Sequence, residues 1–192
     1  FIVPRGTMMD SLALKKTGVT CSYTTAHEVN LLPLKIERIE LGGVPADLPL
    51  AQLGLSQRGI SSALRIRIAC DGPQHLGHLD FDRLEFFLSG PDIEALKLLE
   101  LVMEHHAGIV CQTVSKQPQR QLLSSDALRQ EGFDADQALL PDDLRNFDGY
   151  RLLQEYFAFP ARFRFISLSG LGKLIQRCED EKAFDIFILL DK

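Results

Sequence analysis

The sequence predicts an α+β protein, mainly an antiparallel β-sheet or sandwich with inserted helices. Strand-like stretches dominate the chain, and in the clearest of them apolar and charged residues alternate strictly. Strict alternation is typical of sheets that bury one face and leave the other solvated, and such sheets are mainly antiparallel. Between the strands, longer stretches repeat their apolar residues at helical spacing.

Ala63–Cys70 is the clearest predicted strand, because its aliphatic side chains point to one face and Arg65 and Arg67 point to the other. Ala183–Leu190 is apolar on both alternating faces, which predicts a strand buried on both sides. We expect the neighbours of this strand to be partly missing, so that an unpaired edge promotes self-association. Further strands are predicted at Val19–Thr25, Leu34–Leu41, Arg83–Leu88, Ile109–Val114 and Arg162–Leu168.

Helices are predicted over three segments. Pro91–His106 repeats apolar residues at helical spacing and is followed by Gly108, a residue typical of helix C-termini. Ser124–Gln130 is predicted as a short helix capped by its serine. Gly149–Phe159 is the third, and it ends before Pro160 because proline cannot continue a helix.

The predicted helix Gly149–Phe159 carries a broad apolar face. Its aromatic and leucine side chains cover about half of the helical wheel, while Arg151, Gln154 and Glu155 lie on the other side. An apolar arc wider than the usual ~100° predicts packing against more than one element. Because broad aromatic faces of helices are usually buried within a domain, we expect this face to be core and Phe157→Ala to unfold the protein.

Length, composition and charge limit the classes of protein that fit. The chain has 192 residues, of which 45% are hydrophobic, and this suffices for a single domain. It starts at Phe1 and stops directly after an apolar stretch, whereas domain ends are usually polar, so a fragment from the middle of a longer protein is the alternative. A net charge of −5 argues against nucleic-acid binding, and no apolar run approaches the ~18 residues of a membrane span.

The four cysteines stand far apart, at Cys21, Cys70, Cys111 and Cys178. Zinc sites and redox pairs usually show close spacings of Cys or His, and the sequence has no such spacing. Isolated cysteines in or near apolar segments are typical of proteins in a reducing compartment. A cytoplasmic location is therefore expected.

The sequence predicts no catalytic, cofactor-binding or metal site. Gly170–Lys173 has part of a phosphate-loop pattern but lacks the upstream glycine and the final Ser or Thr, so a turn is the better interpretation. His75 and His78 lie in a turn-rich stretch and are interpreted as solvated loop histidines. Aspartate pairs on polar loops usually form turns rather than acid–base pairs. Asp134/Asp136 and Asp142/Asp143 lie in such a loop, and Asp80 and Asp82 lie on one side of a predicted strand.

The stretch Gly149-Tyr-Arg-Leu-Leu-Gln-Glu-Tyr-Phe-Ala-Phe-Pro160, followed by the aromatic segment Arg162–Phe165, resembles the most distinctive motif of the TssF family, also called VasA or ImpG. Further stretches resemble other motifs of that family in the same order: Val3–Thr7, Cys21–Thr25, Val29–Leu34, Leu79–Gly90 and Gly132–Pro141. The residues that carry the resemblance, and to which we assign structural roles, are Pro4, Gly6, Thr7, Cys21, Thr25, Pro33, Leu34, Gly149, Tyr150, Arg151, Glu155, Tyr156, Phe157 and Pro160.

The resemblance implies a non-enzymatic structural role in the baseplate of the bacterial type VI secretion system. TssF-like proteins join TssG in a wedge complex, which contacts TssK, TssE and the VgrG hub and seeds the contractile sheath. Full-length members of the family are considerably longer than this chain. By this resemblance the chain is a fragment of a cytoplasmic assembly protein whose partners are TssG, TssK, TssE and VgrG-type proteins.

Two other classes of function stay open on the residues alone. A β-rich module that binds carbohydrate would need an exposed aromatic platform, but the chain has no Trp and only three Tyr. A hydrolase could assemble its site from distant Asp, Ser and His residues, although no local motif supports one.

Overall fold

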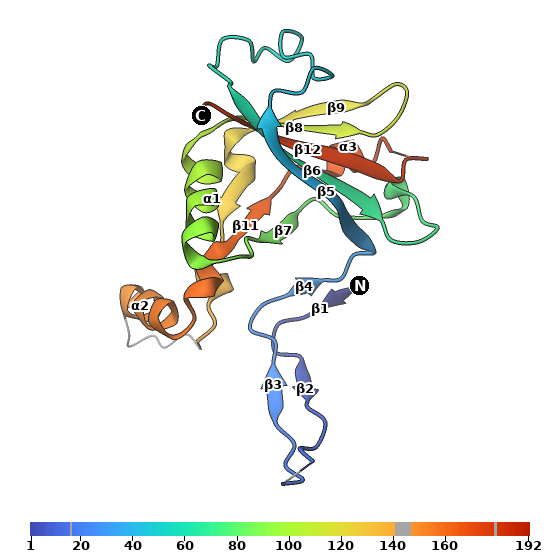
Figure 1. The fold of residues 1–192 in the computed structure, drawn as a ribbon. Helices are drawn as coiled ribbons and strands as arrows, with labels where there is room; N and C mark the ends of the chain where they lie inside the picture. The colour runs from blue at the N-terminus through green and yellow to red at the C-terminus, as the bar shows by residue number, and fades with distance from the viewer. Residues whose placement is uncertain (16, 141–146, 179) are drawn as a thin grey trace. The chain divides into compact units, whose positions relative to one another are not determined.

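The computed structural model describes residues 1–15, 17–140, 147–178 and 180–192. The chain forms two compact units, and each unit combines segments that are distant in the sequence. Unit 1 consists of Phe1–Leu32 and Glu131–Phe163, and unit 2 consists of Pro33–Gln130 and Arg164–Lys192. Antiparallel sheets with inserted helices confirm the predicted α+β class (Figure 1).

Unit 2 is built on a five-stranded antiparallel sheet in the order β5-β6-β12-β8-β9, as the described residues show. Its strands are β5 (Leu34–Gly43), β6 (Ser62–Cys70), β12 (Ala183–Leu190), β8 (His106–Thr113) and β9 (Arg120–Leu123). A three-stranded antiparallel sheet, in the order β10-β11-β7, consists of β10 (Leu128–Gln130), β11 (Phe165–Leu168) and β7 (Leu84–Phe87). The helices of this unit are α1 (Asp92–Glu104) and the short α3 (Gly172–Ile175).

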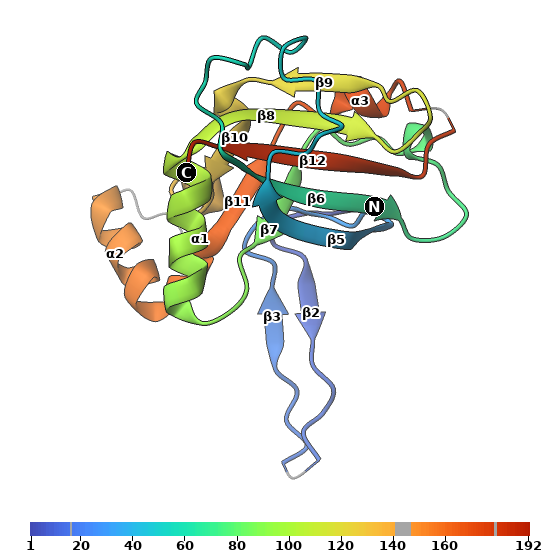
Figure 2. The same cartoon turned by 45° about the horizontal axis from the view of Figure 1, so that its top comes forward.

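Strand β12 lies at the centre of the five-stranded sheet and is buried on both faces, as predicted from its sequence. It pairs with β6 on one side and with β8 on the other. On one face Phe187 packs with Leu48 and Leu55 of the loop between β5 and β6. Figure 2 shows this loop over one side of the sheet, with α1 and the three-stranded sheet on the other side.

The pairing of β12 contradicts the expectation that its neighbours are partly missing. Each edge of the strand is occupied along its length, by β6 from Ser62 to Ala69 and by β8 from His106 to Thr113. A run that is apolar on both faces indicates burial, but it does not distinguish an edge strand from a central one. The edges of the sheet are β5 and β9.

One charged group lies within the centre of the five-stranded sheet. Asp185 of β12 is 1% exposed, and its carboxylate accepts hydrogen bonds from Arg67 at 2.8 and 3.0 Å and from Arg65 at 2.5 Å. Burial raises the pKa of this carboxyl, but the hydrogen bonds from the two arginines outweigh it and hold the pKa below its usual value. The Arg65 guanidinium also lies 5.1 Å from the ring centroid of Phe187.

Several predicted boundaries are wrong, and one predicted helix, Ser124–Gln130, is a 3₁₀ turn followed by a strand. Ser124 does cap a turn, because its hydroxyl accepts from the Asp126 N–H at 3.1 Å, but only the 3₁₀ turn Ser125–Ala127 forms. The next residues pair with β11 as β10, so sheet pairing overrides the local capping signal. The predicted strand Arg162–Leu168 begins only at Phe165, after the 3₁₀ turn Pro160–Arg164, and Val19–Thr25 shortens to β3 (Ser22–Thr24).

Unit 1 combines two short β-ribbons with a helix. The ribbons are β1 (Ile2–Val3) paired with β4 (Val29–Asn30), and β2 (Met8–Asp10) paired with β3. The helix is α2 (Asp148–Ala158), and a 3₁₀ turn lies at Ala135–Gln137. Arg5 joins the two sequence segments of the unit, since its guanidinium donates to the carbonyls of Ala138 at 3.1 Å and Asp136 at 3.4 Å.

Candidate partner-binding surface on helix α2

Helix α2 carries the segment that the sequence singles out most strongly. It begins after Phe147 and ends at Ala158, two residues before Pro160, in agreement with the predicted helix to within one residue at each end. Proline at this position disfavours helical backbone at Phe159 and so ends the helix. Local sequence therefore accounts for the ends of α2. The function of the helix depends on which of its sides is buried.

The polar side of α2 is buried against the rest of unit 1, whereas most of its aromatic side is exposed. Glu155 is 2% exposed, and its Oε1 accepts hydrogen bonds from the backbone N–H groups of Leu139 at 3.0 Å and Leu140 at 3.2 Å. Arg151 donates to the same oxygen at 3.3 Å and to the Phe133 carbonyl at 3.4 Å. A carboxylate can be buried when charge-assisted hydrogen bonds replace its water, and these bonds anchor the helix.

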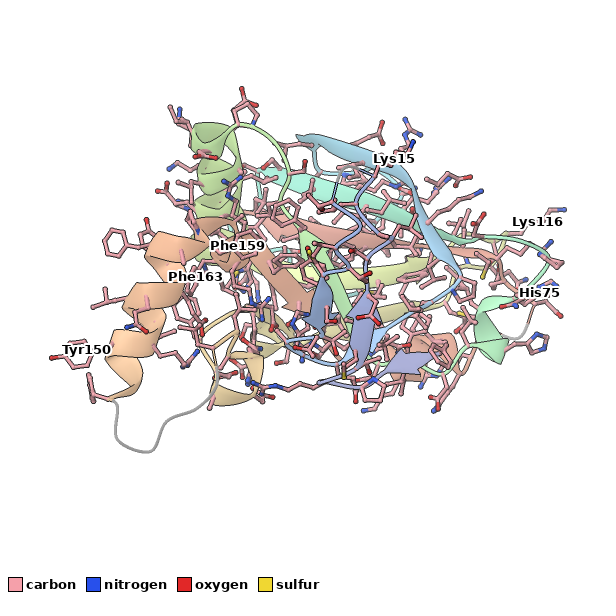
Figure 3. All side chains as sticks on the ribbon, turned by 90° about the horizontal axis from the view of Figure 1, so that it is seen from below. Lys15, His75, Lys116, Tyr150, Phe159 and Phe163 are labelled. Atoms are coloured by element: carbon pink, nitrogen blue, oxygen red, sulfur yellow. The ribbon has the colours of Figure 1, made fainter. Side chains whose placement is uncertain are left out.

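One flank of the apolar arc also contributes to unit 1. The ring centroids of Tyr156 and Phe163 lie 5.8 Å apart, and those of Phe163 and Phe133 lie 5.3 Å apart. Gly132 allows this packing: it has φ +103°, and a Cβ there would lie 3.2 Å from the Phe163 ring. Figure 3 shows Phe159 and Phe163 near the C-terminal end of α2.

The other flank of the arc is exposed. We define the docking face as Tyr150, Leu153 and Phe157, which are 64%, 55% and 80% exposed. Their spacing of i, i+3 and i+7 places them on one side of the helix, and Figure 3 shows Tyr150 projecting outward from α2. A row of large apolar side chains at this spacing is typical of helices that bind an apolar groove of another protein.

The prediction that the aromatic face of this helix is core is therefore wrong. The inward position belongs to Glu155, because its Oε1 accepts from the N–H groups of Leu139 and Leu140, while its buried Oε2 has no hydrogen-bond partner among the described residues. The apolar arc is wider than the side that unit 1 covers, so Phe157 is left exposed. Packing against more than one element was expected from the width of the arc, and among the described residues of unit 1 the docking face has no such second element.

The structure brings together four other residues of the family motifs. The Pro4 carbonyl accepts from the hydroxyls of Thr7 and Thr25, each at 2.7 Å. The backbone N–H of Thr7 donates to the Thr25 hydroxyl at 3.0 Å, and the N–H of Gly6 donates to the Thr25 carbonyl at 2.9 Å. Gly6 has φ +81°, which other residues rarely adopt. This hydrogen-bonded cluster joins the two β-ribbons of unit 1.

The remaining motif residues have separate structural positions. Cys21 is half-buried; its backbone N–H donates to the Ser11 hydroxyl at 3.0 Å, and its carbonyl accepts from the Ser11 N–H at 2.9 Å. The Pro33 carbonyl accepts from the Asp71 N–H at 2.8 Å, and Leu34 begins β5 opposite Cys70. Pro160 opens a 3₁₀ turn. Arg5 and Phe163 matter for unit 1; both lie within the motif segments Val3–Thr7 and Arg162–Phe165 but were not among the residues to which structural roles were assigned.

The glycine-rich stretch Gly170–Lys173 leads into α3, and two of its amides bind a carboxylate of the same chain. Asp82 accepts from the N–H groups of Gly172 at 2.8 Å and Gly170 at 3.1 Å. Asp82 therefore occupies the donors that a phosphate would use. This arrangement argues against a phosphate loop.

The other candidate groups lie apart or form local contacts. The His75 Nδ1 atom lies 2.8 Å from the Asp180 carbonyl, and the His75 and His78 rings meet edge to face with centroids 6.0 Å apart. Across the described residues, no three His, Cys, Asp or Glu side chains cluster as a metal site would require. Pro141 and the pair Asp142/Asp143 lie outside the described residues.

All four cysteines are present as free thiols in the described chain. Burial raises the pKa of Cys178 to about 11, and burial also raises the pKa values of Cys70 and Cys111. No helix within the described ranges is both long enough and apolar enough to cross a membrane.

The fold and the docking face define a class of protein: a β-rich α+β protein whose most conspicuous surface is an apolar helix face of the kind that contacts other proteins. Comparison with known proteins identifies the family. The sequence model of the family described as "Type VI secretion system, TssF" matches residues 1–192. The chain belongs to the TssF family.

A curated relative and a solved structure agree with this assignment. The type VI secretion system component TssF1 of Pseudomonas aeruginosa is 35% identical over 195 residues, which cover 100% of this chain and 30% of the relative. A chain of the TssK-TssF-TssG baseplate subcomplex has the same fold, with a TM-score of 0.75 at 23% identity, over 100% of this chain and 33% of that one. The chain thus spans about a third of the length of both.

Proposed function

We propose that this chain acts as a structural, non-enzymatic component of a type VI secretion baseplate and contributes the docking face of α2 to the assembly. Family membership supports the baseplate role, and the solved subcomplex of matching fold contains TssK and TssG. The observation that carries the proposal is the 80% exposure of Phe157 on a helix that Glu155 anchors by its polar side.

The proposed occupant of the docking face is TssG or TssK. An apolar face of this kind is costly in water and gains free energy when a partner covers it. TssE and VgrG-type proteins remain proposed partners at other surfaces. We further propose a cytoplasmic assembly, which the free thiols support, and an origin of this chain within the middle of a longer TssF polypeptide, which its 30% share of TssF1 supports.

The docking face fits a protein partner better than a carbohydrate. Carbohydrate platforms combine aromatic rings with hydrogen-bonding groups, whereas Leu153 and Phe157 offer none. Aromatic anchors at helical spacing are instead typical of hot spots in protein interfaces.

The test measures co-purification and affinity of the chain with TssG and TssK from the same secretion system. Phe157→Ala should weaken binding of one of them by about tenfold or more, because truncation of an aromatic hot spot typically has that effect. Tyr23→Ala is the matched control, since Tyr23 is an exposed aromatic residue of the same unit but lies on the β2–β3 ribbon. If a folded Phe157→Ala chain binds both proteins as the parent does, the docking face is not their interface.

A further inference from the structure

The outer edge of β5 is an open edge of the five-stranded sheet. Among the described residues β5 pairs only with β6, and Figures 1 and 2 show it at the margin of the sheet. Three aliphatic side chains of this strand are exposed: Ile36 (51%), Ile39 (58%) and Leu41 (57%). The backbone N–H and C=O groups of such an edge can pair with a strand of another chain, and exposed apolar side chains favour that pairing.

A β-bulge in β5 determines which of its side chains share a face. Ile36 pairs with Ile68 and Arg38 with Arg67, so in the described pairing Glu37 has no partner on β6. Leu34 and Leu41 are seven residues apart, and on a regular strand they would lie on opposite faces. Because they pair with Cys70 and Leu64, which are six apart, the bulge places them on the same face.

As a result, the order of apolar and charged positions along β5 is the same from either end of the strand. One face carries Leu34, Ile36, Ile39 and Leu41, which pair with buried residues of β6. The other face carries the charged side chains Lys35, Arg38 and Glu40. The pattern is symmetric about the point between Glu37 and Arg38.

The chemistry of the strand has the same symmetry. The sequence Leu34-Lys-Ile-Glu-Arg-Ile-Glu-Leu41, laid antiparallel against itself about that point, places Leu34 opposite Leu41 and Ile36 opposite Ile39. Lys35 then lies opposite Glu40, and Glu37 opposite Arg38. Each of these pairs is apolar with apolar or of opposite charge, and such cross-strand pairs stabilise antiparallel sheets.

Without the bulge this register would not form, because it would oppose apolar and charged faces. Charged residues on edge strands often prevent association. Here the signs complement one another between two copies. In the free chain Arg38 and Glu40 pair along the strand and Lys35 lies 3.6 Å from Asp71, and these exposed ion pairs can be exchanged at small cost.

We propose that β5 pairs antiparallel with β5 of a second copy of this chain, about a two-fold axis between Glu37 and Arg38. The two five-stranded sheets then join into one continuous sheet across an isologous interface. This inference does not rest on the proposed function, since it involves unit 2 and not the docking face. A seam of eight residues is small beside standard interfaces, so the association is expected to be weak and dependent on concentration.

Charge reversals at Lys35 and Glu40 test the register by sedimentation velocity of the 192-residue chain. Lys35→Glu alone places two Glu–Glu pairs across the seam, and Glu40→Lys alone places two Lys–Lys pairs. Each single variant should self-associate about tenfold more weakly than the parent. An equimolar mixture of the two variants should regain the parent's association, because both of these pairs across the mixed seam then join a glutamate of one chain to a lysine of the other.

Lys97→Glu is the matched control, since it makes the same charge change at an exposed position of α1 and should leave association unchanged. Rescue in the mixture, without rescue in either variant alone, establishes the two-fold register. Three results would overturn the proposal: a parent chain that stays monomeric at millimolar concentration, association that the single variants leave unchanged, or a mixture that associates no better than its components. The second result would place self-association on another surface, such as the docking face.

Discussion

Strand β12 and helix α2 both carry many large apolar side chains, but these side chains are buried in β12 and largely exposed in α2. Both are rich in large apolar residues, and both were expected to be core. In β12 this is correct, and Phe184, Ile186 and Phe187 have no exposed surface. In α2, Tyr150, Leu153 and Phe157 are exposed, and the buried residue is Glu155.

The difference shows what an apolar pattern can and cannot determine. It indicates that a face needs cover, because exposed apolar surface is unfavourable in water. It does not indicate whether the cover comes from the same chain. For β12 the same chain supplies the cover, since Leu48 and Leu55 of the loop between β5 and β6 pack on Phe187. For α2 the hydrogen bonds to Glu155 hold the helix by its polar side, and the docking face stays exposed.

The largest expected effect is in β12. Phe187→Ala removes a ring that packs among Leu48, Leu55 and Val110, and it should lower the free energy of unfolding of unit 2 by about 3–5 kcal/mol. Thermal and denaturant unfolding measure the loss, with Phe187→Leu as a milder control that keeps most of the volume. A Phe187→Ala chain that melts within a few degrees of the parent would mean that this side of the sheet is not a packed core.

The fold of unit 2 could be predicted well where sequence pattern and pairing agree. The alternation in Ala63–Cys70 and the apolar run Ala183–Leu190 correspond to β6 and β12 almost residue for residue. The boundaries of Ser124–Gln130 could not be predicted, because its capping signal is local while its pairing partner, β11, is about 40 residues away in the sequence. The order of the strands was not readable for the same reason.

A smaller effect is expected for the anchor of α2. Glu155→Ala leaves the N–H groups of Leu139 and Leu140 and the Arg151 guanidinium without their shared acceptor, and it should destabilise unit 1 by about 1–3 kcal/mol. Hydrogen exchange of the α2 amides and thermal melting report this loss. The control Gln154→Ala, at an exposed position of the same helix, should change stability by less than about 0.5 kcal/mol. Equal protection in both variants would show that the polar side does not hold the helix.

The candidate site was only half predictable. The spacing of Tyr150, Leu153 and Phe157 gave the apolar side, and the pair Arg151–Glu155 was visible at i and i+4. The burial of Glu155 could not be predicted from the sequence. The two N–H groups that bind its carboxylate belong to Leu139 and Leu140, in a stretch that reads as a polar loop. Burial of a charge depends on such partners and not on its own residue type.

The smallest effect on stability is expected at Phe157, and it decides between the two descriptions of α2. A core ring would cost about 3–5 kcal/mol on truncation to alanine. An 80% exposed ring loses little burial, and alanine also favours the helix more than phenylalanine does, so Phe157→Ala should change stability by less than about 0.5 kcal/mol. Arg151→Ala should cost more, about 1 kcal/mol, because the side chain of Arg151 is only 10% exposed and it bonds to both Glu155 and the Phe133 carbonyl. Thermal melts of the two variants in parallel establish their order. If Phe157→Ala melts well below Arg151→Ala, the aromatic face is covered within the chain, and the docking face does not exist as defined.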